Sequence, residues 1–317
     1  MISAQKYEYW LNERFILKNK ELFQAALKWE LDFSKVEKSG DYPKLIDMLD
    51  EIEEKYEFNM QKMCSTNFQL ISLFQIEFQK EVDIIKRNAS LKFLIACCLI
   101  DKILDSKRYC KDEQLSVVER LTSQWGTECV KKEVFPELDE LLYDVRKYLD
   151  DTINLKNKEY LHGAIRKAYT SEIYMWEHVL LPKEKLEKGK VGLLIDKSIE
   201  FEKAALLLSL GDNISKESMK VAEIIAEITW LADDLCDFLE DIRCKRKNSL
   251  LFVALPEREY VLEERAEDAI NHMEEYVEKL EKAMKALKYA ASENLYYFVI
   301  NLVWKWFAEI RRISDKS

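Results

Sequence analysis

Glycine and proline are scarce in this sequence. The 317 residues include 6 Gly and 4 Pro, whereas Leu, Ile, Lys, Glu and Ala are abundant. Tight turns depend on Gly and Pro, so their scarcity disfavours a sheet-rich fold with many short connections. The composition therefore predicts an all-α chain.

Long hydrophobic runs are also missing. Nowhere do about eighteen apolar residues follow one another, which is the length that a membrane-spanning helix requires. The N-terminal stretch MISAQKYEYWLNERF contains neither a continuous apolar segment nor a cleavage pattern. We therefore expect a cytoplasmic protein that is not an integral membrane protein.

Paired cysteines and an excess of positive charge are the other absences. The 7 cysteines show no metal-ligand spacing, and several lie in apolar runs, which favours reduced, buried thiols. The formal net charge of -10 makes nucleic acid an unexpected partner. An anionic substrate would therefore need a metal ion or a local basic cluster for its binding.

Apolar residues recur at helical spacing in segments separated by short polar breaks. The segments are residues 3–33, 44–62, 66–105 with a break near Asn88, a shorter one between the polar residues 107–114 and the break at 126–136, and residues 137–148, 158–180, 193–211, 257–289 and 295–313. No block repeats at a fixed period, and no long polar linker divides the chain. We predict a single domain, residues 1–317, with ten or more helices.

The most informative stretch is VAEIIAEITWLADDLCDFLEDIRCKRKNSLLFVA, from Val221 to Ala254. On a helix, Asp233, Asp237 and Asp241 form one carboxylate stripe because residues four apart share a face, and Asp234 lies beside it. Apolar residues are interleaved with these aspartates, which a fully solvated acidic face would not require. We therefore expect the stripe to face a cleft.

Closely spaced carboxylates repel one another unless a proton or a hard cation shares the site, and oxygen-only ligation suits Mg²⁺. Arg243, Lys245, Arg246 and Lys247 follow at once, and basic side chains of this kind neutralise anionic oxygens. Metal-binding acids followed by bases are what a diphosphate site needs. The alternative is an ordinary charged helix face in a chain with 34% charged residues.

A second acidic pair ends the apolar run LKFLIACCLIDKILD. Asp101 and Asp105 are four residues apart and share a helix face, whereas Lys102 lies about 100° around the helix. An unpaired carboxylate at the end of an apolar helix is costly to bury. Such pairs also arise by chance at helix ends, so this pair alone identifies no function.

Together these motifs resemble the class I isoprenoid synthases, the superfamily of polyprenyl-diphosphate synthases and terpene synthases. The second motif of the polyprenyl synthases, DDxxD, a further Asp four residues on and then Gly-Lys, is matched by Asp233, Asp234, Asp237, Asp241 and Lys247, with Arg246 in place of Gly. The first motif, also DDxxD, falls at residues 101–105, with Lys102 in place of its second Asp. The family's Lys-Thr pair is matched by Lys197-Ser198, and Glu172 falls on a helix that is similarly acidic in the family.

The resemblance implies a helical bundle around a deep apolar cleft in which Mg²⁺ ions hold the diphosphate of an allylic prenyl substrate. The implied metal ligands are Asp101, Asp105, Asp233, Asp234, Asp237 and Asp241. The implied diphosphate-binding residues are Lys197, Lys247, Arg108 and Arg246. Catalysis would fall to Asp101, Asp105, Asp233, Asp237 and Lys197, and the resemblance leaves a homodimer open. Tyr174, Trp176 and Trp230 would stabilise an allylic cation or simply pack in the core.

Two departures from the family pattern bear on the reaction. The basic loop that binds isopentenyl diphosphate in chain-elongating members has no counterpart before Asp101, and the paired Arg after the first motif is missing. These gaps favour a terpene synthase, a cyclase that releases diphosphate. The alternatives are a chain-elongating prenyltransferase and, because Lys102 interrupts the first motif, a non-catalytic partner subunit.

Overall fold

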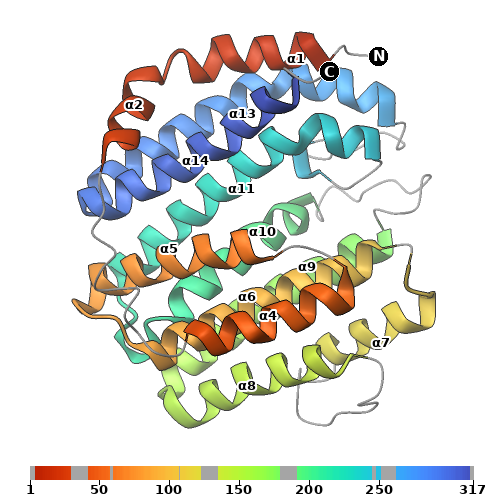
Figure 1. Cartoon of the computed structure of the whole chain (residues 1–317), viewed down its shortest axis with the longest axis vertical. Helices are drawn as coiled ribbons and strands as arrows, with labels where there is room; N and C mark the ends of the chain where they lie inside the picture. The colour runs from red at the N-terminus through yellow and green to blue at the C-terminus, as the bar shows by residue number, and fades with distance from the viewer. Residues whose placement is uncertain are drawn as a thin grey trace. The chain divides into compact units, whose positions relative to one another are not determined.

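The structure is a computed structural model, and it describes residues 4–29, 42–57, 60–106, 108–122, 135–178, 191–244, 248–250 and 262–314. Within these residues the regular elements are helical, and none is a strand (Figure 1). The prediction of an all-α chain is confirmed for this part of the sequence.

The described residues form twelve α-helices and two short helical turns. The α-helices are α1 (Ala4–Leu11), α2 (Lys20–Lys28), α4 (Tyr42–Tyr56), α5 (Gln61–Gln79), α6 (Ile84–Asp105), α7 (Lys111–Thr122), α8 (Pro136–Thr152), α9 (Leu155–His178), α10 (Val191–Leu208), α11 (Lys216–Cys244), α13 (Leu262–Ala290) and α14 (Glu293–Ser314). The short turns are the π-helical η1 (Asn12–Ile16) and the 3₁₀-helical η3 (Gly211–Asn213).

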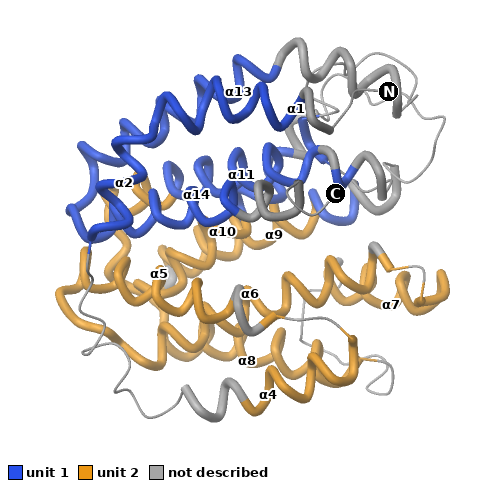
Figure 2. The backbone as a smooth tube through the Cα atoms, turned by 45° about the horizontal axis from the view of Figure 1, so that its top comes forward, with its two compact units in different colours: residues 1–30, 171–200, 223–317 blue, residues 31–170, 201–222 orange. Residues whose placement is uncertain are grey.

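The chain divides into two compact units (Figure 2). Unit 1 contains residues 1–30, 171–200 and 223–317, and unit 2 contains residues 31–170 and 201–222. Helices α9, α10 and α11 therefore each contribute residues to both units.

Aromatic side chains hold the N-terminal segment of unit 1 to its C-terminal helix. The ring of Phe15 lies 4.8 Å from that of Phe307, and the ring of Phe23 lies 5.1 Å from that of Trp304. Aromatic rings bury large apolar areas and so contribute strongly to the stability of a core, and tilted pairs add about 0.5–1.5 kcal/mol each. Helix α2 consequently lies along α14 (Figure 1).

Helix α6 is the centre of unit 2 and packs against α5, α7 and α8. Its residues are buried on almost every side, including Leu91, Phe93, Leu94, Ile95, Ala96, Leu99, Ile100, Ile103 and Leu104. A helix that is apolar all round belongs in an interior, where neighbouring helices cover each face. This burial explains why its sequence lacks the polar face of a surface helix.

The helix break in this region differs from the sequence-based expectation. Helix α5 ends at Lys80, which adopts a left-handed backbone conformation with φ of 69°, and α6 then runs without interruption through Asn88. Asp83 caps the start of α6, where its carboxylate accepts a hydrogen bond from the backbone N–H of Lys86 at 3.2 Å. Asp is a preferred N-cap residue, whereas a left-handed Lys has no such sequence signature.

None of the helices in the described residues is long and apolar enough to cross a membrane. Five of the cysteines can be described, and none of these five forms a disulfide: Cys64, Cys97, Cys98, Cys110 and Cys236.

Glu202 on α10 makes the stability of unit 2 dependent on pH. Burial raises the pKa of its carboxyl to about 7. Because the folded-state pKa lies above the unfolded one, this group contributes stability at low pH that is lost as the pH rises towards 7. Because the Glu202 side chain is partly exposed, we expect its ionisation to lower the free energy of unfolding by only about 1–3 kcal/mol. Calorimetric melting temperatures measured from pH 4.5 to 7.5 should fall less steeply for Glu202→Gln than for the unchanged protein; parallel curves would contradict this.

Candidate functional site

The acidic residues of α11 lie in unit 1 and differ in their exposure. Asp233 and Asp237 are exposed and stand one helical turn apart, whereas Asp234 is partly buried and Asp241 is only 8% exposed. The interleaved Leu235 and other apolar residues of this helix are buried. Two of the four carboxylates, those of Asp233 and Asp237, therefore lie at the surface of unit 1, and the other two are partly or largely buried.

Asp234 is held by two hydrogen bonds to the same oxygen. The indole Nε1–H of Trp230 donates to its Oδ2 at 2.9 Å, and the hydroxyl of Ser249 donates to that oxygen as well. Trp230 Nε1 also lies 2.7 Å from Ser249 Oγ. Burial raises the pKa of the Asp234 carboxyl to about 6, although these hydrogen bonds and the charge of Lys197 act to lower it. These contacts favour a structural role for Asp234. Trp230 belongs to the same hydrogen-bonded group through its indole N–H.

Asn248 secures the segment 248–250 to the same helix. Its Nδ2 donates to the carboxylate Oδ2 of Asp241 at 3.1 Å and to the main-chain carbonyl of Asp234 at 2.8 Å. Its Oδ1 accepts the backbone N–H of Leu250 at 3.1 Å. Each polar atom of this buried amide therefore has a partner, as buried polar groups require.

The N-terminal helix also contacts the acidic stretch. The buried hydroxyl of Tyr7 on α1 donates to the carbonyl oxygen of Leu235 at 2.7 Å, and its ring lies 5.4 Å from that of Phe238. Burial, with the nearby charges of Cys236 and Asp234, raises the pKa of Tyr7 well above its ordinary value, so it remains a neutral donor. Helix α1 is thereby fixed to α11 between Asp233 and Asp237.

Lys197 on α10 joins two other helices of unit 1. Its Nζ lies 2.7 Å from the Glu172 carboxylate of α9, which is fully buried, while the lysine side chain is 18% exposed. The same lysine charge acts on Asp234 of α11, where it lowers the pKa that burial has raised. Lys197 therefore pairs with Glu172 within unit 1, and its charge is the weakest of the influences on the pKa of Asp234; its place in a diphosphate site stays a prediction.

The first acidic motif lies in unit 2, at the C-terminal end of α6. Asp101 is partly buried and Lys102 is exposed, and the side chain of Asp105 lies outside the described residues. Gln114 of α7 donates from Nε2 to the carbonyls of Ile103 and Leu104 at 3.2 and 3.0 Å. The two aspartates of this motif therefore lie within the last five residues of α6.

The other residues predicted to bind the diphosphate or the allylic cation are exposed, partly buried or outside the described residues. Arg108 is exposed in unit 2 and forms an ion pair with Glu57 at 3.0 Å. Arg246, Lys247 and the side chain of Trp176 lie outside the described residues. Tyr174 is partly buried in unit 1.

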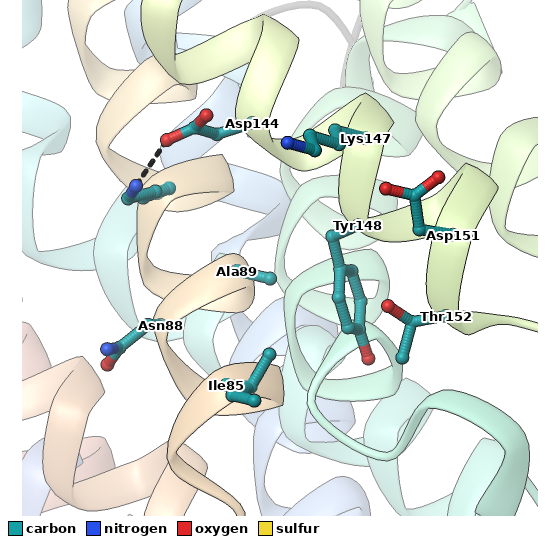
Figure 3. A pocket seen from close by; sticks show the side chains of 9 residues that line it. Ile85, Asn88, Ala89, Asp144, Lys147, Tyr148, Asp151 and Thr152 are labelled. Carbon is teal, nitrogen blue, oxygen red and sulfur yellow. Dashed lines mark hydrogen bonds and ion pairs between the residues drawn. The ribbon is translucent and has the colours of Figure 1, made fainter.

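A surface pocket of about 350 Å³ lies elsewhere, between α6 and α8 of unit 2 (Figure 3). Its charged lining consists of two lysines and two aspartates, and Lys92 forms an ion pair with Asp144. Figure 3 shows Lys147, Asp151 and Tyr148 along the α8 side. Its two positive and two negative side chains favour neither an anionic nor a cationic ligand. None of the predicted metal-binding or diphosphate-binding residues lines this pocket.

Three residues that contact the acidic stretch of α11 could not be identified from the sequence: Tyr7, Asn248 and Ser249. Tyr7 lies more than two hundred residues from its partner Leu235, and no local pattern marks such a contact. Asn248 and Ser249 follow the basic cluster directly, and a short polar pair between a helix and an apolar segment is the only signal they offer.

Mg²⁺ remains a predicted cation for these carboxylates. Among the described residues, no group of three or more His, Cys, Asp or Glu side chains is arranged to hold a metal ion. Protein-bound Mg²⁺, however, commonly uses one or two carboxylates and completes its octahedron with water and substrate phosphates. Asp233 and Asp237 are two exposed carboxylates one turn apart on α11, and Asp241 is a more buried carboxylate that accepts a hydrogen bond from Asn248.

Comparisons with models of protein families and with the sequences of curated proteins find no match for this chain.

The Lys197–Glu172 ion pair should be essential to unit 1. Removing one partner of a buried pair costs about 3–5 kcal/mol because the other charge is left uncompensated, whereas removing both costs less. We expect Lys197→Met to destabilise the protein strongly and Lys197→Met/Glu172→Gln to recover part of that loss in urea denaturation. Strictly additive losses in this double-mutant cycle would show that the two charges are not coupled.

Proposed function

We propose that this protein is a Mg²⁺-dependent class I isoprenoid synthase that ionises an allylic prenyl diphosphate, and that it acts as a terpene synthase. The proposal includes the isoprenoid synthase fold with its apolar cleft. Asp233, Asp237 and Asp241 would hold cations, Asp101 and Asp105 remain predicted ligands from the first motif, and Lys197 would bind the diphosphate.

The observation that carries the proposal is the position of Lys197. The Lys-Ser pair and the second acidic motif are about three dozen residues apart in the sequence, yet the charge of Lys197 acts on Asp234 within unit 1. Lys197 is also largely buried and pairs with Glu172 of another helix, which an ordinary charged surface would not require. A cation–carboxylate–lysine arrangement is what an anionic leaving group requires.

Bound Mg²⁺ would supply Lewis-acid stabilisation of the charge that develops on the departing diphosphate. The residues of this chain would do the rest. Asp233 and Asp237 would orient the cation at the surface of α11, and the ammonium of Lys197 would donate to diphosphate oxygens. Glu172 would orient Lys197 through the ion pair at 2.7 Å and balance its charge where the lysine side chain is only 18% exposed.

The same environment favours departure of the leaving group over simple binding. Charge that develops on the diphosphate oxygens during bond cleavage interacts more strongly with a fixed ammonium than the ground-state charge does. Lys197 is already oriented by Glu172, so little reorganisation is needed during the reaction.

The cyclase reaction is favoured over chain elongation on one ground. An elongating synthase must bind isopentenyl diphosphate through a second basic site, and the sequence lacks the loop that provides it in the family. Arg108, one basic residue near the first motif, is engaged with Glu57. Chain elongation remains the alternative, followed by a non-catalytic partner subunit.

Product analysis tests the proposed reaction. Purified protein with Mg²⁺ is incubated with allylic diphosphates of increasing length, alone and then with isopentenyl diphosphate. We expect diphosphate release and a hydrocarbon or alcohol of unchanged carbon number from the allylic substrate alone, because the nucleophile of a cyclase lies within the same molecule.

Asp237→Asn should remove this activity. Glu223→Gln serves as the matched control and should leave it unchanged, because Glu223 is an exposed carboxylate of the same helix, α11, outside the acidic motif. Products longer by five carbons that form only with both substrates would establish the elongating alternative. No diphosphate release under any condition would support the partner-subunit interpretation.

A further inference from the structure

The last turns of α13 carry lysines without a matching set of acids. Lys285 and Lys288 are exposed, and after Glu281 the sequence of this helix contains no further acidic residue. Glu281 is itself engaged by Lys18 Nζ at 2.6 Å and by Asn19 Nδ2 at 3.0 Å. The exposed end of this helix is therefore basic, although the chain as a whole has a formal net charge of -10.

Helix α2 brings two further lysines to the same end of unit 1. Lys20 and Lys28 are exposed. Trp29, which follows α2, stacks on Tyr297 of α14 with the ring centroids 4.9 Å apart, and α14 begins at Glu293, directly after α13 ends. The last turns of α2 and α13 consequently both adjoin the start of α14 (Figure 1, Figure 2).

Large apolar side chains lie exposed among these lysines. Leu27 of α2 is 52% exposed, and Tyr289 of α13 is 79% exposed. Residues four or seven apart share a helix face, so Tyr289 stands beside Lys285 and Leu27 stands on the side of Lys20. We call this surface the α2–α13 patch, and it consists of Lys20, Leu27, Lys28, Lys285, Lys288 and Tyr289.

We propose that the α2–α13 patch binds the surface of a membrane that contains anionic lipids. Lysine head groups reach lipid phosphates while their aliphatic stems and the neighbouring apolar side chains enter the interface. Tyr289 suits this position because its ring is apolar and its hydroxyl is polar. A nucleic acid would use the same positive charge but would gain little from an exposed aliphatic side chain such as Leu27.

Charge also decides which partner and which orientation fit. An anionic surface repels an acidic chain except where basic residues are concentrated. The four lysines of the patch outnumber the two exposed acids in its neighbouring sequence, Glu21 and Glu293. A second copy of the chain would fit poorly, because a symmetric contact would bring the patch against itself and like charges together.

Vesicle co-sedimentation of the full-length protein tests this binding. Vesicles of phosphatidylcholine and phosphatidylserine in equal parts should bind the protein, whereas vesicles of phosphatidylcholine alone should not. Each lysine close to a charged leaflet contributes about fivefold in affinity, so Lys20→Gln/Lys285→Gln/Lys288→Gln should weaken binding about 100-fold. Added salt should weaken binding of the unchanged protein because it screens these charges.

Lys147→Gln/Lys156→Gln/Lys220→Gln is the matched control. These three lysines are exposed residues of unit 2, and their replacement changes the net charge by the same amount. Vesicle binding should stay within about twofold of that of the unchanged protein. Leu27→Ser/Tyr289→Ser keeps every lysine and should still weaken binding several-fold, because it removes apolar contact with the interface.

An equal loss in the two lysine variants would show that binding follows net charge alone, and it would overturn the role of the patch. Equal binding to both kinds of vesicle, or binding to neither, would overturn it as well. Retention on a single-stranded oligonucleotide but not on vesicles would assign the patch to nucleic acid instead. Circular dichroism of each variant shows that it is folded. Lipid binding does not depend on the proposed reaction, so either assay can fail while the other succeeds.

Discussion

The ion pair between Lys197 and Glu172 is the interaction on which the candidate site depends. A fully buried carboxylate must be protonated, hydrogen-bonded or paired with a cation, and Lys197 supplies a cation for Glu172 from another helix. The charge of the same ammonium is also the weakest of the influences on the pKa of Asp234 on α11, which it lowers. The ion pair itself joins the first part of α10 to the last part of α9 within unit 1.

The acidic motif of α11 divides into residues with different roles. Asp234 is fixed by Trp230 and Ser249, and Asp241 is held through Asn248, whereas Asp233 and Asp237 are exposed. The four aspartates therefore differ in their surroundings: Asp234 and Asp241 are held by hydrogen bonds, whereas the other two lie at the surface. The division follows from the return of residues 248–250 against α11, and it gives the proposed cation site both a rigid support and an open side.

The helices could be predicted from the sequence because apolar residues repeat at helical spacing and tertiary packing reinforces that pattern. The bounds of α9, expected at 158–180 and found at Leu155–His178, illustrate the agreement. The break before α6 was misplaced because the chain reverses at a left-handed Lys80 instead of a glycine, and Asn88 is tolerated inside a buried helix.

Within the candidate site, helical spacing was enough to group the aspartates of α11, and the family resemblance linked them to Lys197. The separate role of Asp234 was not predictable, because it depends on a hydroxyl that follows the end of the helix and folds back. The same holds for Tyr7, whose contact with Leu235 joins opposite ends of the chain. The single domain predicted for residues 1–317 stays a prediction beside the two compact units.

The central claim is that Lys197 and the carboxylates of α11 form a site for a cation and a diphosphate together. Calorimetric titration of the protein with inorganic pyrophosphate, in the presence and absence of Mg²⁺, tests it most directly. The account predicts that pyrophosphate binds only with Mg²⁺ and that Lys197→Met/Glu172→Gln, which removes the ammonium without leaving a buried charge, weakens this binding by about tenfold or more, as the loss of a charged hydrogen bond of about 1.5–3 kcal/mol requires. Pyrophosphate binding that is independent of Mg²⁺, or unchanged in the double variant, would contradict it.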